Sequence, residues 1–249
     1  MSLVYVLSIA FCAINLVTVH AEDVALPSSV KTCKKDSDDY SSCLRLALQE
    51  SWPIFVQGIP ELGVPSLEPF VVEFQSGNYK VGEVSGQIVT KNIRSYGLAK
   101  TRFLSVKPQH DTKGRFSLEI DSEMSKVFVE GDYKAEGAVG SFRVGGKGHF
   151  NISMEDVRSV WEIEGPVVND KWIIETFRLT PDVGKMKIWA SDLFNGNEEL
   201  TKAALAFANE YWPVFYRDML PYAAETWNPY LRDLVGNIFS KLSFSKTFP

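Results

Sequence analysis

The residues able to carry chemistry are few, and their spacing favours neither a catalytic nor a metal site. The 249-residue chain has three histidines, and neither His110 nor His149 has a neighbouring cysteine or histidine. Acid pairs such as Glu162/Glu164 are explained by same-face acids on an exposed strand. The sequence contains no nucleophile elbow, zinc-binding H-E-x-x-H or Walker loop. We therefore expect no enzymatic activity, no metal ion and no cofactor.

Composition and charge exclude several further classes. Hydrophobic residues make up 45% of the chain, which is typical of a globular protein and not of a disordered or collagen-like one. Acidic residues outnumber basic ones by 31 to 26, and there is no basic block to neutralise phosphates. A nucleic-acid partner is therefore not expected.

The N-terminus predicts secretion. Residues Met1–Ala21 carry no Lys, Arg, Asp or Glu, and their apolar run Val4–Val17 is shorter than the roughly 20 residues that span a bilayer. The run ends in Val19-His20-Ala21, small residues that suit a signal peptidase. The alternative, a buried helix, leaves Glu22-Asp23 and Pro27 unexplained. We predict a signal peptide at 1–21 and one extracellular domain at 22–249, without stable membrane insertion.

Two further features fit an extracellular protein. Removal of Cys12 with the leader leaves Cys33 and Cys43, an even pair in an oxidising compartment. Two free thiols are not expected in a secreted chain, and the spacing is not that of a C-x-x-C redox motif. We therefore expect a structural disulfide, worth roughly 3 kcal/mol by loop entropy. Asn151-Ile152-Ser153 is a sequon that predicts N-glycosylation at Asn151.

Glycine positions outline the order of elements. Sixteen of the 17 glycines lie between Gly58 and Gly196, and glycine is disfavoured inside helices. This predicts a helix, then many strands, then helices. The first helix should begin near Ser37 as N-cap and end at Gly58, with a kink or break at Pro53.

From Leu67 to Trp189 the pattern has period two, as in Phe70/Val72/Phe74, and predicts seven to nine antiparallel strands. The cluster Gly145–Gly148 precedes no helix, so we expect a bulge or strong curvature there rather than a phosphate-binding loop. The expected turns are Ser76-Gly77-Asn78, Lys113-Gly114, Gly165-Pro166, Asn169-Asp170 and Pro181-Asp182.

The C-terminal segment is helical in pattern. Asn197 is a good N-cap, and Asn228-Pro229 predicts the start of a fresh helix. A straight helix of about 45 residues would run about 68 Å, longer than a compact globule of this size. The segment must therefore bend, or the molecule must be elongated. One apolar stripe of the segment is Leu200, Ala204, Phe207, Tyr211 and Phe215.

The large apolar load on these helices and strands has two interpretations. It forms an ordinary core, or a curved sheet around a helix leaves an apolar tunnel for a ligand. Trp161 and Trp172 can lie on either face of the sheet, and Tyr133 is a candidate polar contact. The candidate ligand-binding residues are Trp52, Phe55, Tyr133, Trp161, Trp172, Phe207, Tyr211 and Phe215.

Several motifs together resemble the insect takeout and haemolymph juvenile-hormone-binding proteins over the mature chain. They are Cys33-(nine residues)-Cys43, Gly58–Pro69 (GIPELGVPSLEP), Gly131-Asp132-Tyr133, Gly146–Ile152 (GKGHFNI) and Leu193–Asn197 (LFNGN). The resemblance implies an α+β fold, with a highly curved antiparallel β-sheet wrapped around a long C-terminal α-helix and a shorter N-terminal helix (a super-roll). It also implies the Cys33–Cys43 disulfide, secretion into a haemolymph-like fluid and a tunnel for a terpenoid, fatty acyl or similar lipid. Moth hormone carriers have a second disulfide that this chain lacks, which favours the takeout-like branch.

The expected function is that of a secreted, non-enzymatic carrier of a small hydrophobic ligand. One alternative is a signalling or interaction protein that acts through a cell-surface receptor and whose cavity is structural. The other is a lipid esterase, for which His110 and His149 are the only bases of the usual kind in the mature chain.

Overall fold

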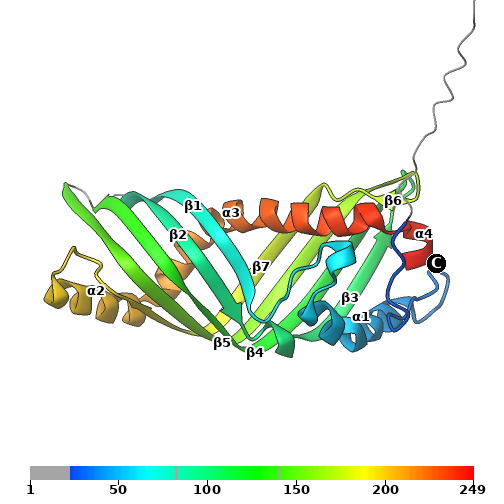
Figure 1. Ribbon diagram of the computed structural model, residues 1–249, viewed down its shortest axis with the longest axis horizontal. Helices are drawn as coiled ribbons and strands as arrows, with labels where there is room; N and C mark the ends of the chain where they lie inside the picture. Colours follow the sequence, from blue (N-terminus) through cyan, green and yellow to red (C-terminus); the bar gives the residue numbers. More distant parts are fainter. Residues whose placement is uncertain (1–22, 82–83, 140) are drawn as a thin grey trace, which may run out of the picture.

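The fold is seen in a computed structural model that describes residues 23–81, 84–139 and 141–249. In this part of the chain a helix is followed by strands and then by further helices, as expected (Figure 1). Short 3-10 turns lie at Pro60–Leu62 and Leu98–Lys100. The predicted signal peptide lies outside the described residues.

Helix α1 (Tyr40–Gln57) begins later than expected. Its N-cap is Asp39 and not Ser37, whose hydroxyl donates to the Asp39 carboxylate instead. The prediction for the C-terminus is confirmed, because the helix ends at Gly58 with a φ of 89°. Pro53 lies inside α1, and the helix continues through it. Packing of α1 against the sheet therefore outweighs the hydrogen bond lost at the proline.

The sheet is antiparallel and is centred on its two longest strands. Strand β5 pairs with β4 along nearly its whole length, while β2 and β3 share the other side of β4. Strand β1 lies beyond β2, and β7 lies beyond β5. The strands are β1 (Phe70–Val81), β2 (Val84–Tyr96), β3 (Arg102–His110), β4 (Arg115–Val139), β5 (Phe142–Val168), β6 (Lys171–Trp172) and β7 (Thr176–Ala190).

Two of the five expected turns are confirmed. Lys113-Gly114 joins β3 to β4, and Asn169-Asp170 joins β5 to β6 with positive φ at both residues. The other three predictions are wrong, because Ser76-Gly77-Asn78 lies within β1, Gly165-Pro166 within β5 and Pro181-Asp182 within β7. Pro181 is tolerated because β7 is an edge strand, where its missing N–H breaks no ladder bond.

The glycines of β5 serve close packing rather than a bulge. The pairing of Gly145–Gly148 with β4 is uninterrupted, so the expected bulge is absent from this described stretch. A Cβ on Gly146 would lie 2.0 Å from the carbonyl oxygen of Asp192, and one on Gly148 would lie 2.1 Å from Ser191 Oγ. Only glycine at these positions lets the chain after β7 cross directly over β5.

The side chains that face the core switch from even-numbered to odd-numbered positions part-way along the strands. In β4 the buried residues include Leu118, Ile120 and Met124, and then Val127 and Tyr133. Even-numbered positions therefore give way to odd-numbered ones. The change coincides with residue 156 of β5, an aspartate with a φ of 55° that lies level with the switch. A strict alternation would assign half of each strand to the wrong face.

The C-terminal segment forms α2 (Glu198–Glu210), α3 (Trp212–Lys241) and the short α4 (Phe244–Thr247). Asn197 caps α2 as predicted, its side chain accepting a hydrogen bond from Leu200 N at 3.0 Å. The break falls at Tyr211, so the prediction of a fresh helix at Asn228-Pro229 is wrong. The Asn228 side chain accepts instead from Leu179 N of β7 at 3.0 Å, which fixes the unbroken helix to the sheet.

Helix α3 runs along the length of the curled sheet and contacts both of its edge strands. It packs on β7, and it also reaches β1, where the rings of Phe70 and Tyr230 lie 6.1 Å apart. Figure 1 shows an elongated molecule with α1 and α4 at one end and α2 at the other. The expected curved sheet with a long C-terminal helix and a shorter N-terminal helix is confirmed.

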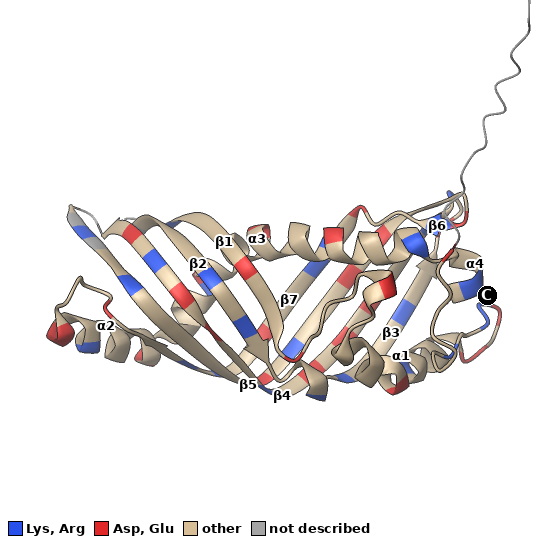
Figure 2. Cartoon of the chain, viewed as in Figure 1, with Lys and Arg blue, Asp and Glu red and all other residues tan. Residues whose placement is uncertain are grey.

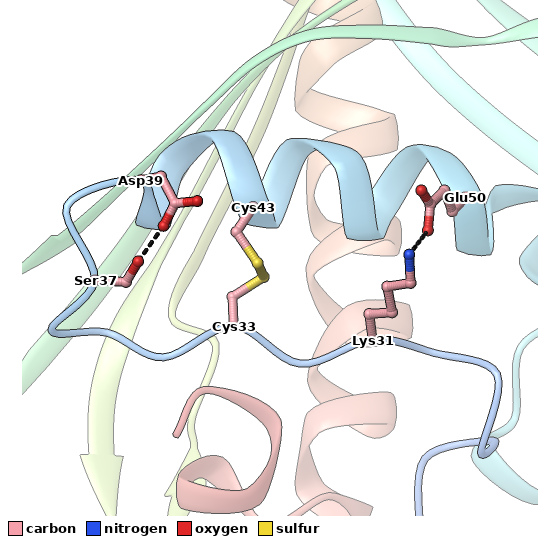
Figure 3. The surroundings of a disulfide bond; sticks show 6 residues. All are labelled: Lys31, Cys33, Ser37, Asp39, Cys43 and Glu50. Carbon is pink, nitrogen blue, oxygen red and sulfur yellow. Dashed lines mark hydrogen bonds and ion pairs between the residues drawn. A yellow bond between two sulfur atoms is a disulfide. The ribbon is translucent and has the colours of Figure 1, made fainter.

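The predicted disulfide joins the N-terminal arm to α1. Cys33 and Cys43 are bonded, with Cα atoms 5.9 Å apart, and Cys33 is buried (Figure 3). An ion pair of 2.6 Å between Lys31 Nζ and Glu50 Oε2 holds the same arm about two turns further along α1. The arm is thereby fixed along α1.

Candidate ligand-binding site

Four of the eight candidate residues lie at the α1 end of the molecule. Trp52 of α1 packs against Phe103 and Trp161, with ring centroids 5.0 and 6.2 Å away, and its indole N–H donates to Leu98 O. Phe55, one turn further along α1, lies 6.4 Å from Trp52. Trp172 belongs to the same core cluster. The structure therefore brings Trp52, Phe55, Trp161 and Trp172 together.

Trp172 lies deepest of these four residues. It is 1% exposed, and its ring lies 4.8 Å from Phe116 and 4.7 Å from Phe239. Its indole N–H donates to Gly165 O. Phe248, beyond α4, packs on the same group at 6.1 Å from Trp172. This end of the molecule is closed by interlocked aromatic rings.

Asp170 fastens the C-terminal segment over this closed end. Its carboxylate accepts hydrogen bonds from the Ser243 hydroxyl at 2.5 Å and from Ser245 N at 2.7 Å, and these bonds lower the pKa of Asp170. Its carbonyl oxygen accepts from Phe244 N at 2.7 Å. The turn after β5 thus fixes α4 in place.

Three other candidates gather at the opposite part of the molecule. Phe207 of α2 lies 4.9 Å from Tyr211 and 5.6 Å from Phe215, measured between ring centroids. All three are exposed, as are Leu200 and Val214 beside them. We call Leu200, Phe207, Tyr211, Val214 and Phe215 the aromatic stripe. The stripe is an accessible apolar surface, in contrast to the closed end.

Helix α3 is fixed at both edges of the sheet but is not buried in it. Tyr216 and Trp227 donate to carbonyl oxygens of β7, Pro181 O at 2.8 Å and Leu179 O at 3.3 Å. The Tyr222 hydroxyl donates to Lys80 O of β1. No residue of α2 or α3, both fully described, is fully buried, although Tyr216 and Phe239 of α3 are partly buried against the sheet. Helix α3 is thus only partly covered, and Phe215 and Tyr230 remain exposed.

Tyr133, the eighth candidate, lies apart from both groups. It is buried in β4, and its hydroxyl donates to Ser191 O at 2.5 Å. Burial raises the pKa of Tyr133, and the charge of Asp192 adds to this. The hydroxyl is thus neutral at physiological pH, and its oxygen retains the capacity to accept a hydrogen bond.

Two hollows open to solvent have charged side chains in their lining. One of about 340 Å³ has Lys134, Glu136, Arg143 and Lys147 among its lining residues. Another of about 600 Å³ is lined by Arg217, Asp218, Pro221, Tyr222 and Glu225. Basic and acidic residues are interspersed over the strands (Figure 2). Neither hollow is the long apolar tunnel that the resemblance implies, and the tunnel stays a prediction.

Comparison with protein families decides the assignment. Residues 7–249 match the model of the family described as haemolymph juvenile hormone binding protein. The chain belongs to this family. Among solved structures, Takeout 1 of Epiphyas postvittana superposes with a TM-score of 0.70 at 22% identity, covering 88% of this chain and 99% of that one. It shares the fold.

Two further comparisons do not bear on the family or the fold. A lipopolysaccharide binding protein gives a TM-score of 0.28 at 13% identity, covering 71% of this chain and 35% of that one. A search of curated proteins finds no match.

The two histidines in the described part of the chain, His110 and His149, lie in unrelated places. His149 Nδ1 lies 2.5 Å from Asp132 Oδ1 at the surface. The hydrogen bond from Asn92 lowers the pKa of Asp132 most, and the contact with His149 adds to this. His110 stacks on Phe116 at 4.5 Å, and burial lowers its pKa, as does the charge of Lys35. Within the described ranges neither imidazole bonds to a serine or threonine hydroxyl, and no group of side chains is arranged to hold a metal.

Sequence reasoning missed residues that position the site. Asn209 and Tyr216 fix α2 and α3 to β7, and Trp212 packs with Tyr216 against the middle of the sheet. Their spacing of three or four residues forms a second helical face beside the aromatic stripe. The spacing of this second face can be seen in the sequence. Why the face contains an asparagine is explained only by the unpaired edge of β7, to which Asn209 hydrogen-bonds.

Burial raises the pKa of Tyr216 to about 12, and Asp182 adds to the effect. The neutral hydroxyl is favoured in the folded state, so its contribution is present below pH 10 and is lost as pH rises towards 12. We expect Tyr216→Phe to lower the free energy of unfolding by about 1 kcal/mol at pH 8. Urea titrations at increasing pH should show the wild-type advantage shrinking above pH 10. A difference that grows in that window would contradict this role.

Proposed function

We propose that the protein is a secreted, non-enzymatic carrier that binds a small hydrophobic ligand between the curled sheet and helices α2 and α3. A juvenile-hormone-like terpenoid, a fatty acyl chain or another lipid of similar size is the ligand class. The observation that supports this most is the incomplete burial of α3. This helix is bonded to β1 and β7, and yet none of its side chains is fully buried, while Phe215 and Tyr230 stay exposed. Membership of a hormone-binding family supports the same conclusion.

The candidate residues divide into two roles in this proposal. Phe207, Tyr211 and Phe215 contact the ligand directly, because they are aromatic and accessible. Trp52, Phe55 and Trp161 form the inner wall at the closed end, with Trp172 behind them, and Tyr133 offers a hydroxyl oxygen as a polar contact. A ligand that buries roughly 300 Å² of apolar surface gains about 7 kcal/mol before ordering costs. This magnitude suits reversible, micromolar transport.

Secretion and glycosylation are part of the same proposal. The apolar leader at 1–21 and the disulfide between Cys33 and Cys43 support export to an oxidising compartment. None of the helices in the described part of the chain is long and apolar enough to cross a membrane. Asn151 lies within β5, and a glycan there would be detected as a mass shift that peptide N-glycosidase removes.

The carrier function is tested by the lipid content of the native protein. We expect native mass spectrometry of gently purified protein to show a bound lipid. After delipidation, titration with the fluorescent fatty acid cis-parinaric acid should saturate at one or a few sites. A lipid-free protein that takes up neither cis-parinaric acid nor a farnesyl-derived probe would contradict the proposal.

The exposed stripe also fits the second candidate, an interaction protein that contacts a cell-surface receptor. Contiguous exposed apolar surface often marks a protein–protein interface. In that case the stripe would be covered by the partner and not by lipid. Acidic substitutions in the stripe would then leave the uptake of cis-parinaric acid unchanged, an outcome considered in the Discussion.

A further inference from the structure

One side chain holds α2 to the sheet. Asn209 Oδ1 accepts from Ile188 N at 2.8 Å, and Asn209 Nδ2 donates to Ile188 O, also at 2.8 Å. The amide thereby replaces a neighbouring strand at the free edge of β7. Among the described residues it is the only α2 side chain that hydrogen-bonds to the sheet.

The backbone groups of Ile188 depend on this contact. Ile188 lies opposite Ile152 of β5, but its N–H and C=O are both taken by Asn209 and so point away from β5. If α2 moved away, both groups would face water. Protection of the Ile188 amide from hydrogen exchange therefore reports on whether α2 is attached.

The junction between α2 and α3 has the properties of a hinge. Tyr211 has φ −107° and ψ 17°, outside the helical range, and Pro213 follows it. Pro213 has no N–H to donate to the carbonyl oxygen of Asn209, so the helical ladder is interrupted there. Helix α3 beyond this point is fixed to both edge strands by Tyr216, Tyr222, Trp227 and Asn228. Bending at the junction would move α2 alone.

The aromatic stripe lies on the side of α2 that faces away from β7. Phe207 and Tyr211 are each two residues from Asn209, which is about 200° around a helix. Asn209 faces β7, so these rings point away from that strand. Farther along, Tyr222 extends the line of Tyr211 and Phe215 and bonds to Lys80 O of β1. The stripe thus continues the side of the helical segment that faces β1, and α3 contacts both β1 and β7.

We propose that α2 is a gate over the ligand site and that Asn209 is the latch that sets the rate of ligand exchange. Asn209 is a positioning residue that acts through α2, and it does not contact the ligand. The proposal rests on the carrier function above. It predicts that loss of the latch changes how fast a ligand enters and leaves far more than it changes affinity, because Asn209 itself makes no contact with the ligand.

The test compares Asn209→Ala with a matched variant at the other end of the molecule. Gln49 of α1 makes the same pair of bonds at β3, to Thr101 O at 3.1 Å and from Phe103 N at 2.9 Å. Gln49→Ala therefore removes equivalent bonds at the closed end. Stopped-flow fluorescence with cis-parinaric acid measures association and dissociation rates, and hydrogen exchange measures protection of the Ile188 amide.

We expect Asn209→Ala to raise both rate constants by about tenfold, the effect of two modest hydrogen bonds, with the dissociation constant within about twofold. The Ile188 amide should lose its protection. Asn209→Asp, which keeps the acceptor and loses the donor, should also raise both rates. Gln49→Ala should change neither rate.

Each contrary outcome has a distinct meaning. Rapid exchange of the Ile188 amide in the wild type would overturn the latch. Unchanged rates in Asn209→Ala despite a deprotected Ile188 amide would overturn the gate. A changed dissociation constant with unchanged association would show that Asn209 belongs to the ligand contacts instead. Failure of the wild type to take up cis-parinaric acid would overturn the carrier function and the gating role together. Hydrogen exchange of the Ile188 amide would still show whether Asn209 holds α2 to β7.

Discussion

Trp172→Ala is expected to lower the free energy of unfolding by about 4 kcal/mol, the largest effect of any single substitution considered. The side chain is 1% exposed and is enclosed by Phe116, Phe239 and Phe248, so its removal leaves a cavity that rigid aromatic neighbours do not fill. The indole also gives up its hydrogen bond to Gly165 O. Urea unfolding followed by circular dichroism measures the change.

The matched control is Trp189→Ala on an exposed position of β7. Trp189 is 47% exposed, so the same truncation should cost less than about 1 kcal/mol. Equal losses for the two tryptophans would contradict the closed, tightly packed end. Trp172→Ala protein that is stable but takes up no cis-parinaric acid would place Trp172 in the ligand site itself rather than behind it.

The double substitution Phe207→Asp and Tyr211→Asp is expected to weaken the uptake of cis-parinaric acid at least about tenfold. Two charges on the aromatic stripe would face an apolar ligand, and burying an unpaired carboxylate is strongly unfavourable. Because both side chains are exposed, at 56% and 46%, the free energy of unfolding should change by less than about 1 kcal/mol. Fluorescence titration and urea unfolding measure the two quantities.

An equally exposed aromatic pair on the strands provides the control. Phe74 and Trp189 are 58% and 47% exposed, so Phe74→Asp with Trp189→Asp adds the same charge at similar exposure. This variant should bind cis-parinaric acid as the wild type does. If the stripe variant also binds normally, the stripe does not contact the ligand, and the receptor-binding alternative gains support. If both variants lose binding equally, the effect is one of net charge.

Local patterns in the sequence predicted the elements that depend on local forces. Glycine distribution separated the strands from the helices, Asn197 marked the start of α2, and Gly58 marked the end of α1. The parity of the two remaining cysteines predicted the disulfide, and the combined motifs predicted the family. Helix caps, backbone conformational preferences and loop closure act over a few residues, so they can be predicted from a single sequence.

Features that depend on contacts between distant segments were beyond reach of the sequence. The breaks predicted at Pro181 and Pro229 were wrong, because an edge strand tolerates proline and packing keeps α3 continuous. Alternation alone could not assign faces, since the inward side changes parity level with Asp156. The role of Asn209 could be recognised only from the structure, which places its side chain against the unpaired edge of β7.

The sequence by itself determined the order of the elements, the disulfide and the family, whose signals lie in short segments and in residue types. Only the tertiary structure decided which aromatic residues close one end of the molecule and which stay accessible at the other. Both groups consist of aromatic side chains, and residue type alone does not separate them. What separates Trp172 from Phe207 is the number of distant segments that pack around each, and that number is set when the sheet curls and α4 folds over its end.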